Sequence, residues 1–338
     1  MSSTKTSSDS AFRAVIAGTG SYAPDKQLTN EDLTKMIETS DEWITTRTGI
    51  KVRHIAAENQ TTAMLATEAA KRAIQQANIS AEDIELIITA TITPEMVFPS
   101  TACFVQDMLG AKKAWAFDIS AACSGFVYAL SIAQNFVING RYDNVLVIGA
   151  EALSKIVDYK DRKSCILFGD GAGAAVIKRG DKKGPRGVFY STSGSDGSGW
   201  PAIHCPAYGS RYPVSKPLEN PDYIYMQING REVYQLAVRK IIETVDDCLV
   251  NCGLSIKDID LFIPHQMNAR IIESVAKRLE LSDEKVFINI DKYGNTSAAS
   301  IPIALDECVR GGRIKKGDIV LLVAFGGGLT WGANVIEF

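Results

Sequence analysis

The sequence predicts an α/β protein built from two copies of one unit. Short β-branched runs such as 14–20 and 84–91 alternate with helical-period segments such as 62–78. This alternation is typical of a mainly parallel sheet covered by helices. Residues 77–86 (ANISAEDIEL) also align with residues 252–261 (CGLSIKDIDL) at a constant offset of 175. Because self-similarity at a fixed spacing marks a repeated structural unit, we expect an internally duplicated chain.

In chain order, the first half reads as strands that are each followed by a helix. The strands are expected at 14–20, 84–91 and 114–120, and the helices at 62–78, at 99–109 and in the apolar segment after Cys123. That last segment contains no helix breaker for about four turns and is apolar on most faces. A long buried helix is therefore expected directly after Cys123.

The second half repeats this order and ends in a hairpin. Residues 139–151 correspond to 311–327, with the offset drifting by about three residues through a loop. The chain closes with a strand, three consecutive glycines at 326–328 and another strand. Between the halves, 193–222 is too rich in Gly, Ser, Pro and Tyr for a helix or strand, and loops of this length are usually functional lids or mobile. The expected organisation is a disordered tail at 1–11, an N-terminal half at 12–184 and a C-terminal half at 185–338.

The composition argues against several classes of protein. The net charge of −3 gives no global basic field, so nucleic acid is not expected as a partner. The seven cysteines are scattered, odd in number and without a Cys-x-x-Cys pair, which argues against a disulfide framework or a zinc site. The first ten residues lack the apolar core of a signal peptide, and no later stretch offers about 18 uninterrupted apolar residues. We expect a cytoplasmic protein with no membrane span and no bound metal.

Cys123 is the first candidate catalytic residue. It follows the strand expected at 114–120 and precedes the buried helix, so its thiol is expected at a helix N-terminus. There the helix dipole and unpaired N–H groups would stabilise a thiolate and lower its pKa. An inert cysteine in the core remains the alternative from this context alone.

His265 and Asn295 are the candidates that would complete a site with Cys123. His265 stands just after a predicted buried strand, and its loop corresponds through the repeat to the loop after the strand at 84–91. Asn295 lies in the loop that corresponds to the one carrying Cys123. The repeat therefore brings the three loops to one face, at the crevice where open α/β sheets bind ligands. A lone histidine after a strand is more often structural, but this convergence favours a catalytic role.

Two glycine-rich segments give weaker signals. The run 326–328 would let the backbone approach a ligand and aim an N–H at an oxyanion. A tight hairpin without a ligand explains the run better by itself, although its correspondence with 147–153 favours a site. Residues 169–176 (GDGAGAAV) fit neither the dinucleotide nor the phosphate-loop pattern, so we interpret them as a sharp turn.

Seven segments, taken in order, carry a resemblance to a known family. They are GTGSYAPD (18–25), SDEWITTRTGI (40–50), DISAACSGF (118–126), LFGDGAGA (167–174), PHQMNARI (264–271), YGNTSAAS (293–300) and AFGGGLTWG (324–332). With them the chain resembles β-ketoacyl-acyl-carrier-protein synthase III, the initiating condensing enzyme of type II fatty-acid synthesis in the thiolase superfamily. The resemblance extends from about residue 12 to residue 338.

This resemblance implies a thiolase-like fold, internally duplicated and five-layered (α/β/α/β/α), in a homodimer. It implies an acyltransferase that joins an acyl-CoA primer, acetyl-CoA foremost, to malonyl-acyl carrier protein, giving a 3-oxoacyl-acyl carrier protein, CoA and CO₂ without a cofactor. Cys123 would be the acylated nucleophile, and His265 and Asn295 would act on the malonyl donor. The backbone N–H groups of Cys123 and Gly327 would hold the oxyanion.

The resemblance also implies binding residues for coenzyme A and for the acyl carrier protein. Adenine would lie between a tryptophan and an arginine, where stacking and cation–π contact suit its ring. The positions that match the family's coenzyme A and acyl sites are Trp43, Arg162, Arg47 near the phosphates, Asn268 and Gly230 along the pantetheine arm, and Phe98, which would reach across the dimer to the acyl pocket. Arg270 and Lys277, seven residues apart and so on one helix face, would meet the acidic carrier protein, although a solvated helix face explains them equally.

Four other functions compete with this interpretation. A related synthase that loads medium-chain or aromatic acyl groups shares the motifs and differs in pocket shape. A papain-like hydrolase has Cys, His and Asn in the same chain order, but its Cys-Gly-Ser-Cys-Trp context is missing. A non-enzymatic acyl-CoA or nucleotide-binding module would not need Cys123, His265 and Asn295. An NAD dehydrogenase would need a third glycine and a helix opening after 17–25 (AGTGSYAPD).

Overall fold

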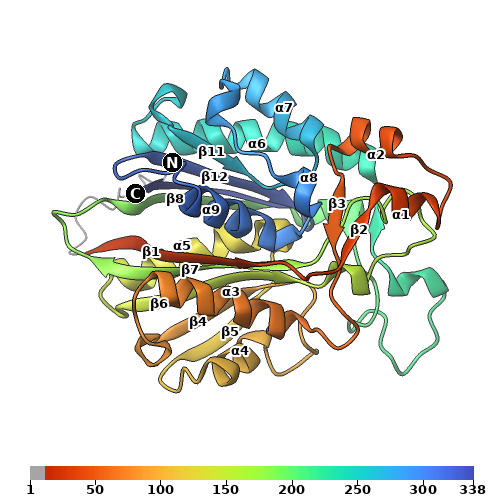
Figure 1. Cartoon of the computed structure of the whole chain (residues 1–338), viewed down its shortest axis with the longest axis horizontal. Helices are drawn as coiled ribbons and strands as arrows, with labels where there is room; N and C mark the ends of the chain where they lie inside the picture. Colours follow the sequence, from red (N-terminus) through yellow and green to blue (C-terminus); the bar gives the residue numbers. More distant parts are fainter. Residues whose placement is uncertain (1–11) are drawn as a thin grey trace.

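The computed structural model describes residues 12–338, which form a layered α/β structure (Figure 1). The strands are β1 (Arg13–Tyr22), β2 (Gln27–Thr29), β3 (Val52–His54), β4 (Leu86–Ala90), β5 (Trp115–Ile119), β6 (Asn144–Glu151), β7 (Gly171–Gly180), β8 (Gly187–Ser195), β9 (Ile203–His204), β10 (Gln227–Ile228), β11 (Leu261–Pro264), β12 (Ile319–Gly326) and β13 (Thr330–Glu337). The α-helices are α1 (Asn30–Thr34), α2 (Asp41–Thr48), α3 (Thr62–Gln76), α4 (Thr101–Leu109), α5 (Gly125–Ile138), α6 (Gly230–Cys252), α7 (Ala269–Arg278), α8 (Ile290–Tyr293) and α9 (Ser300–Arg310). Two 3-10 turns matter for the site, η3 (Ala122–Ser124) and η9 (Ser297–Ala299).

Five layers alternate through the molecule (Figure 1). Within the described residues the large sheet runs in the order β11-β12-β13-β8-β1-β7-β6-β4-β5. Its two parts meet at a single register pair, Ala14 with Gly187, between β1 and β8. Helices α5 and α9 lie between the two parts, α3 and α4 cover one outer face, and α6 and α7 cover the other. The expected thiolase-like layered fold is therefore confirmed.

The boundary that the sequence predicts between the two halves lies in a connection between strands. The division at residue 184 lies in the connection between β7 and β8. The tail expected at 1–11 lies outside the described residues. Residues 193–222 are less irregular than expected, because β8 continues to Ser195 and the segment 203–204 forms β9. β9 pairs with β10, which ties this long connection down beside the site.

The sheet is mixed, and the expectation of a mainly parallel sheet was wrong. Pairs β4–β5, β4–β6 and β11–β12 are parallel, whereas β1–β7, β6–β7, β12–β13 and β8–β13 are antiparallel. The reason is the connections: no α-helix lies between β6 and β7 or between β12 and β13. A parallel neighbour needs a crossover, usually helical, so strands joined without one run antiparallel.

The internal repeat is visible in the backbone at the same offset of 175 residues. β6 corresponds to β12 from end to end, and η3 corresponds to η9. Both turns begin at a residue with positive φ, 46° at Ala122 and 48° at Ser297, and each leads directly into a buried helix. The two halves therefore present two equivalent turns, each directly before a buried helix of the central layer.

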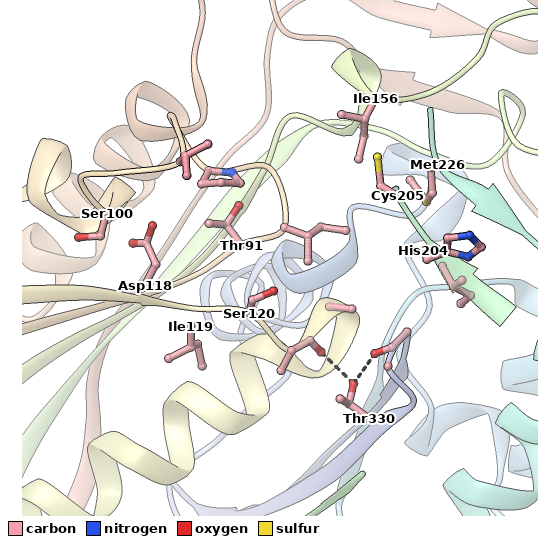
Figure 2. A pocket seen from close by; sticks show the side chains of 18 of the residues that line it. Thr91, Ser100, Asp118, Ile119, Ser120, Ile156, His204, Cys205, Met226 and Thr330 are labelled. Atoms are coloured by element: carbon pink, nitrogen blue, oxygen red, sulfur yellow. Dashed lines mark hydrogen bonds between the residues drawn. The ribbon is translucent and has the colours of Figure 1, made fainter. Parts of the chain in front are cut away.

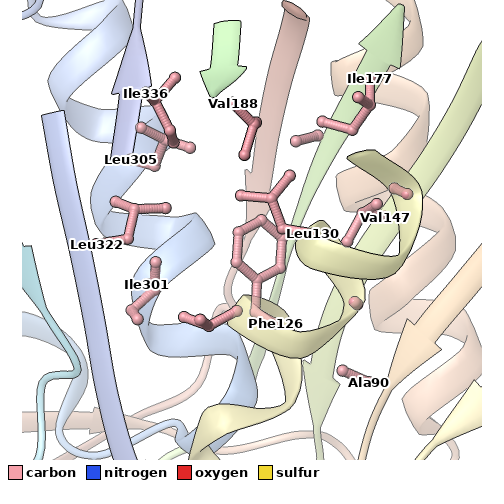
Figure 3. Packing of buried hydrophobic residues seen from close by; sticks show 14 of the residues in the cluster. Ala90, Phe126, Leu130, Val147, Ile177, Val188, Ile301, Leu305, Leu322 and Ile336 are labelled. Carbon is pink, nitrogen blue, oxygen red and sulfur yellow. The ribbon is translucent and has the colours of Figure 1, made fainter. Parts of the chain in front are cut away.

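The central layer fixes these two turns (Figure 3). Phe126 and Leu130 of α5 pack in one cluster with Ile301 and Leu305 of α9, between residues of both parts of the sheet. All four side chains are buried. Burying one such side chain stabilises the fold by roughly 1.5–3 kcal/mol. Because each helix begins at its turn, this packing holds η3 and η9 in place.

Candidate active site

A cavity of about 800 Å³ opens beside η3 (Figure 2). Its walls come from the carboxyl ends of β4 and β5, from the long connection between the halves and from the last hairpin. The wall includes Thr91, Ile92, Met96, Val97, Ser120, Ala121 and Ala122 from the first half, and Ile203, Cys205, Gly327 and Thr330 from the rest. The connection 193–222 thus contributes directly to the cavity wall.

Cys123 is the middle residue of η3, just before the buried helix α5, as expected. Burial raises the pKa of its thiol to about 12, and the negative charge of Glu151 adds to this while the Ser297 hydroxyl opposes it. The expected lowering of the pKa was therefore wrong for the free protein, because desolvation of a thiolate outweighs the helix end. Without a substrate the Cys123 thiol is protonated at neutral pH.

The end of β12 lies against the Cys123 turn. A Cβ atom on Gly326 would lie 2.7 Å from the Cys123 backbone nitrogen, so this position requires glycine. Thr330 ties the same hairpin to η3, since its hydroxyl lies 2.9 Å from the Ala121 carbonyl oxygen and 3.1 Å from that of Gly327 (Figure 2). The backbone of Gly327 is held beside the cavity by these contacts.

His265 follows β11 and is 1% exposed. Its Nδ1 lies 2.6 Å from the Ser300 hydroxyl oxygen, which also accepts a hydrogen bond from the Gln266 backbone nitrogen at 3.3 Å. Burial lowers the pKa of the imidazole to about 3, so His265 is neutral. Its Nε2 is buried without a hydrogen-bond partner among the described residues, which leaves this atom for a ligand.

Asn295 is clamped by its backbone to the segment before β7. Its backbone N–H donates to Leu167 at 2.8 Å, and its carbonyl accepts from Gly169 at 3.1 Å. Its side-chain oxygen accepts the Ser297 N–H at 2.8 Å. Because the side-chain oxygen makes this bond, the Nδ2 amino group of the same amide points in another direction and can donate hydrogen bonds. The sharp turn expected over 169–176 was wrong, because residues 171–176 belong to β7, and Gly169 just before this strand contacts Asn295.

The turn η9 is the common neighbour of the three candidates. It contacts η3, its Ser297 lies beside Cys123 and Asn295, and Ser300 after it bonds His265. The structure therefore brings Cys123, His265 and Asn295 into one site. Several buried polar atoms there have no hydrogen-bond partner among the described residues: Ser124 Oγ, His265 Nε2, Thr296 Oγ1 and Ser297 Oγ. Such a concentration of unpaired groups is typical of a site that completes itself with water or substrate.

Two arginine guanidinium groups lie over the Trp43 ring and make cation–π contacts with it. The Arg47 carbon Cζ lies 4.6 Å and that of Arg162 4.8 Å from the tryptophan ring centroid. Arg162 also donates to the Glu38 carbonyl oxygen at 3.0 Å. The resemblance implies a space for adenine between Trp43 and Arg162, but in this structure the two side chains contact each other directly. A hollow of about 460 Å³ beside them is lined by Trp43, Arg47 and Arg270 together with Ser40, Glu42 and Thr46.

The other expected binding residues are distributed around the site. Asn268 caps α7 by accepting from the Arg270 backbone nitrogen at 2.9 Å and donates to the Arg47 carbonyl at 3.0 Å. Gly230 is the exposed first residue of α6. Phe98 is 82% exposed, in the loop before α4. Arg270 and Lys277 are both exposed on α7, and Glu273 is exposed between them.

Sequence reasoning missed four residues of this site: Glu151, Ser297, Ser300 and Thr330. For three of them, comparison of the two copies of the repeat could have given a signal. Ser297 and Ser300 are the counterparts of Ala122 and Gly125 at offset 175, and Glu151 is the counterpart of Gly326. A polar residue on one side of a repeat, with a small residue on the other, is a signal that the two copies have diverged in function.

Three further findings concern membrane helices, metal ligands and disulfides. No helix within 12–338 is long and apolar enough to cross a membrane. In the same residues no group of three or more His, Cys, Asp or Glu side chains is arranged to hold a metal ion. All seven cysteines are free thiols.

The family models and the relatives that match this chain all belong to one family. The model described as 3-oxoacyl-[acyl-carrier-protein (ACP)] synthase III matches residues 117–197, and the one described as its C-terminal part matches residues 249–338. The β-ketoacyl-[acyl-carrier-protein] synthase III of Caldanaerobacter subterraneus subsp. tengcongensis is 57% identical over 325 residues, which cover 96% of this chain and 98% of the relative. The protein of the same description from Clostridioides difficile is 54% identical over 329 residues, covering 96% and 98%.

Solved structures give the same picture. The 3-oxoacyl-[acyl-carrier-protein] synthase III of Aquifex aeolicus superposes with a TM-score of 0.89 at 50% identity, covering 96% of this chain and all of that chain. The priming β-ketosynthase of the R1128 polyketide pathway superposes with a TM-score of 0.90 at 34% identity, covering 97% of both chains. The similarity therefore includes the strands, turns and helices that form the site.

Proposed function

Because the chain belongs to the β-ketoacyl-[acyl-carrier-protein] synthase III family, it is a condensing acyltransferase, and we propose that Cys123 carries the acyl group. The reaction joins an acyl-CoA primer, foremost acetyl-CoA, to malonyl-acyl carrier protein and releases CoA and CO₂. The observation that carries the site assignment is the convergence of Cys123, His265 and Asn295 on η9. The relatives' shared description favours this function over the medium-chain or aromatic alternative.

In the first half-reaction the Cys123 sulfur attacks the carbonyl carbon of the primer thioester. The carbonyl oxygen becomes an oxyanion, for which the backbone N–H groups of Cys123 and Gly327 are the proposed donors. Gly327 lines the cavity, and Gly326 packs directly on the Cys123 backbone, which supports this pairing. One such donor is typically worth about 3 kcal/mol of transition-state stabilisation. The CoA thiol then leaves, and the acyl group remains on sulfur.

In the second half-reaction the malonyl group loses CO₂ and becomes an enolate. Its oxygen would accept hydrogen bonds from His265 Nε2 and Asn295 Nδ2. The Ser300 hydroxyl at Nδ1 favours the tautomer with its proton on Nε2, and the low pKa keeps His265 neutral and able to donate one hydrogen bond. The enolate carbon attacks the acyl group on Cys123, so no base is needed to remove a C–H proton.

Coenzyme A and the carrier protein would approach from the side of α2 and α7. Adenine would insert between Trp43 and Arg162 by replacing their cation–π contact, with Arg47 near the phosphates. Asn268, which joins α7 to the end of α2, and Gly230 at the start of α6 would line the pantetheine path. Arg270 and Lys277 would attract the acidic carrier protein, with Glu273 between them reducing the local positive charge.

A homodimer is the proposed assembly. β5 is an edge strand of the sheet, and its Trp115 is 44% exposed. The nearby loop presents Val97 at 90% exposure together with Phe98. Exposed apolar side chains next to an open strand edge are typical of an interface. In such a dimer Phe98 would reach the acyl cavity of the other subunit, which Met96 and Val97 already border.

The proposed setting is the cytoplasm, where seven free thiols stay reduced. The two substrates already carry the activated thioester and the carboxylate that leaves, so we propose that no cofactor or metal is required.

The test is the intact mass of the protein after incubation with acetyl-CoA. We expect an acetyl adduct that malonyl-acyl carrier protein consumes, and no adduct in Cys123→Ser. Longer or aromatic acyl-CoAs assayed in parallel identify the preferred primer. Cys205→Ser is the matched control, because Cys205 is a thiol that lines the cavity beside η3 but lies outside the catalytic turn. An adduct that persists in Cys123→Ser would refute the proposed nucleophile.

A further inference from the structure

Glu151 is a buried carboxyl group behind the wall of the acyl cavity. It ends β6 and has no exposed surface. Its oxygens accept hydrogen bonds from the Thr91 and Thr93 hydroxyls at 3.2 and 2.7 Å, and from the Ile92 and Thr93 backbone nitrogens at 3.2 Å. Thr91 and Ile92 themselves line the cavity. Thr91 and Ile92 therefore separate the Glu151 carboxyl group from the cavity.

The Ser297 hydroxyl is a polar group of η9 that lies close to both Glu151 and the nucleophile. It is beside both the Cys123 sulfur and the Glu151 carboxyl group, and it lowers the pKa of each. Ser297 is 2% exposed, and its Oγ makes no hydrogen bond of normal geometry in this conformation. A small shift of this hydroxyl would let it accept from the thiol and donate to the carboxylate.

The internal repeat explains why these groups meet. Glu151 is the counterpart of Gly326, and each ends a strand that packs on the turn of the opposite half. Gly326 lies against η3, where a side chain would collide with Cys123. β6 lies equally close to η9, because a Cβ on Gly149 would collide with the Ala298 carbonyl oxygen. The carboxyl group of Glu151 is thus held at η9 by the same geometry that places Gly326 at η3.

Acyl transfer requires a group that takes the thiol proton. Burial lowers the pKa of His265 to about 3, which makes its imidazole a weak base. Burial raises the pKa of Glu151 to about 7, which makes its carboxylate a much stronger one. Asp170 precedes Gly171, the ladder partner of Glu151, but it bonds Ser154 and the Ala56 nitrogen instead.

We propose that Glu151 accepts the proton of the Cys123 thiol through the Ser297 hydroxyl during acylation, and this inference rests on the proposed acylation of Cys123. The S–H proton moves to the Ser297 oxygen while the Ser297 proton moves to Glu151, and the sulfur forms its bond to the acyl carbon. When the bond from that carbon to the CoA sulfur breaks, the proton returns along the same path to the CoA thiolate. The single negative charge passes from the Glu151 carboxylate to the sulfur, then to the carbonyl oxyanion and the leaving CoA thiolate, and it returns to Glu151 with the proton transfer, so no second buried charge is created.

The test compares Glu151→Gln and Ser297→Ala with the parent protein in single-turnover acylation by acetyl-CoA, measured in H₂O and in D₂O. Both changes should slow acylation by about 10²- to 10³-fold, the lower part of the range for a lost proton transfer. The solvent isotope effect of the parent should decrease towards one in both variants. Ser297→Ala should fold normally, because alanine already holds the same backbone conformation at position 122.

Three controls separate proton transfer from a structural role. Thr93→Val removes the hydrogen bond from the Thr93 hydroxyl to the same carboxyl group, and the one that its oxygen accepts from the Ala152 nitrogen, but it keeps the carboxyl group, so the solvent isotope effect on acylation should stay at the parent value. Peptide mapping of the acetyl adduct in Glu151→Gln should still place it on Cys123, because the sulfur remains in place. Decarboxylation of malonyl-acyl carrier protein without a primer should also keep its rate, since His265 and Asn295 are untouched.

The opposite results have distinct meanings. A carboxylate that acts only as a nearby charge raises the pKa of Cys123, so removing it would speed acylation, and faster or unchanged acylation in Glu151→Gln overturns the relay. An unchanged isotope effect in both variants overturns it as well. If the parent itself forms no adduct, the proposed function fails together with the relay.

Discussion

The turns η3 and η9 have the same backbone and opposite chemistry. Ala122 and Ser297 share their positive φ, and both turns begin a buried helix. In the first half, Ala90 and Gly125 pack so closely that a Cβ on Gly125 would lie 2.8 Å from the Ala90 Cβ. Their counterparts at offset 175 are His265 and Ser300, which form a hydrogen bond instead.

This comparison shows how a duplicated fold makes an asymmetric site. The first turn keeps small neighbours and carries the nucleophile Cys123, whose counterpart is Ala298. The second turn carries the polar groups, with Asn295 in the position equivalent to Ser120. We infer that acyl transfer belongs to the first turn and enolate stabilisation to the second. If this division is right, mutations in one turn should damage one half-reaction and spare the other.

The largest effect is expected for Cys123→Ala. Without a nucleophile, condensation should fall by at least about 10⁴-fold. Decarboxylation of malonyl-acyl carrier protein should persist, because the second turn is intact. Release of CO₂ in the absence of a primer is the measurement. Loss of decarboxylation in the folded variant would show that the two turns act as one unit.

His265→Ala should have the converse effect. Removing one donor to the enolate oxygen should slow decarboxylation by about 10²- to 10³-fold. Acylation of Cys123 by acetyl-CoA should continue, since the weakly basic imidazole is not needed to take the thiol proton. Rapid quenching followed by intact-mass analysis measures both steps. Failure of acylation would assign His265 to the first half-reaction.

The pH dependence of stability should distinguish the two buried groups. His265 has a pKa lowered from 6.5 to about 3, so the unfolded chain binds its proton first and stability falls as the pH falls below 6.5. Glu151 has a pKa raised from 4.5 to about 7, so its contribution is lost as the pH rises from 4.5 to 7. Each slope is about 1.4 kcal/mol per pH unit.

Between pH 4.5 and 6.5 these two slopes have opposite signs and should offset each other. Relative to the parent protein, His265→Ala should therefore lose stability as the pH rises, and Glu151→Gln should lose it as the pH falls. Urea unfolding at pH 4.5, 5.5 and 6.5 tests this. Parallel curves for the two variants would contradict the assigned protonation states.

Gly125→Ala tests the packing of the first turn. Alanine normally favours a helix by about 0.5–1 kcal/mol over glycine. Here the added Cβ would collide with Ala90, so we expect a net loss of about 1–3 kcal/mol in the free energy of unfolding. Gly230→Ala, where nothing lies within 4 Å, is the matched control at another helix start. Denaturant unfolding of both proteins should show a loss in Gly125→Ala alone.

The smallest effect is expected for Ser300→Ala. It removes the hydroxyl that holds His265 Nδ1 and costs about 1 kcal/mol, or roughly a fivefold loss in condensation rate. Acylation should be unaffected. Steady-state rates with malonyl-acyl carrier protein measure the change. An equal loss in acylation would indicate a general disturbance of the core.

The sequence predicted the architecture of the site because the repeat places equivalent loops on one face. It could not give the direction of the Cys123 pKa shift, since this depends on how far burial outweighs a helix N-terminus. It also could not reveal that Arg47 and Arg162 both stack on Trp43, because side-chain contacts between distant segments leave no periodic signal. The mixed sheet does not follow from the alternation of strands and helices, because the connections from β6 to β7 and from β12 to β13 contain no α-helix.

The division of labour between the turns is tested most directly by loading Asn295→Ala with acetyl-CoA and then adding malonyl-acyl carrier protein. Intact mass should show an acetyl adduct formed at nearly the parent rate and consumed at least about 10²-fold more slowly. Failure to form the adduct, or its consumption at the parent rate, would contradict the assignment of enolate stabilisation to the second turn.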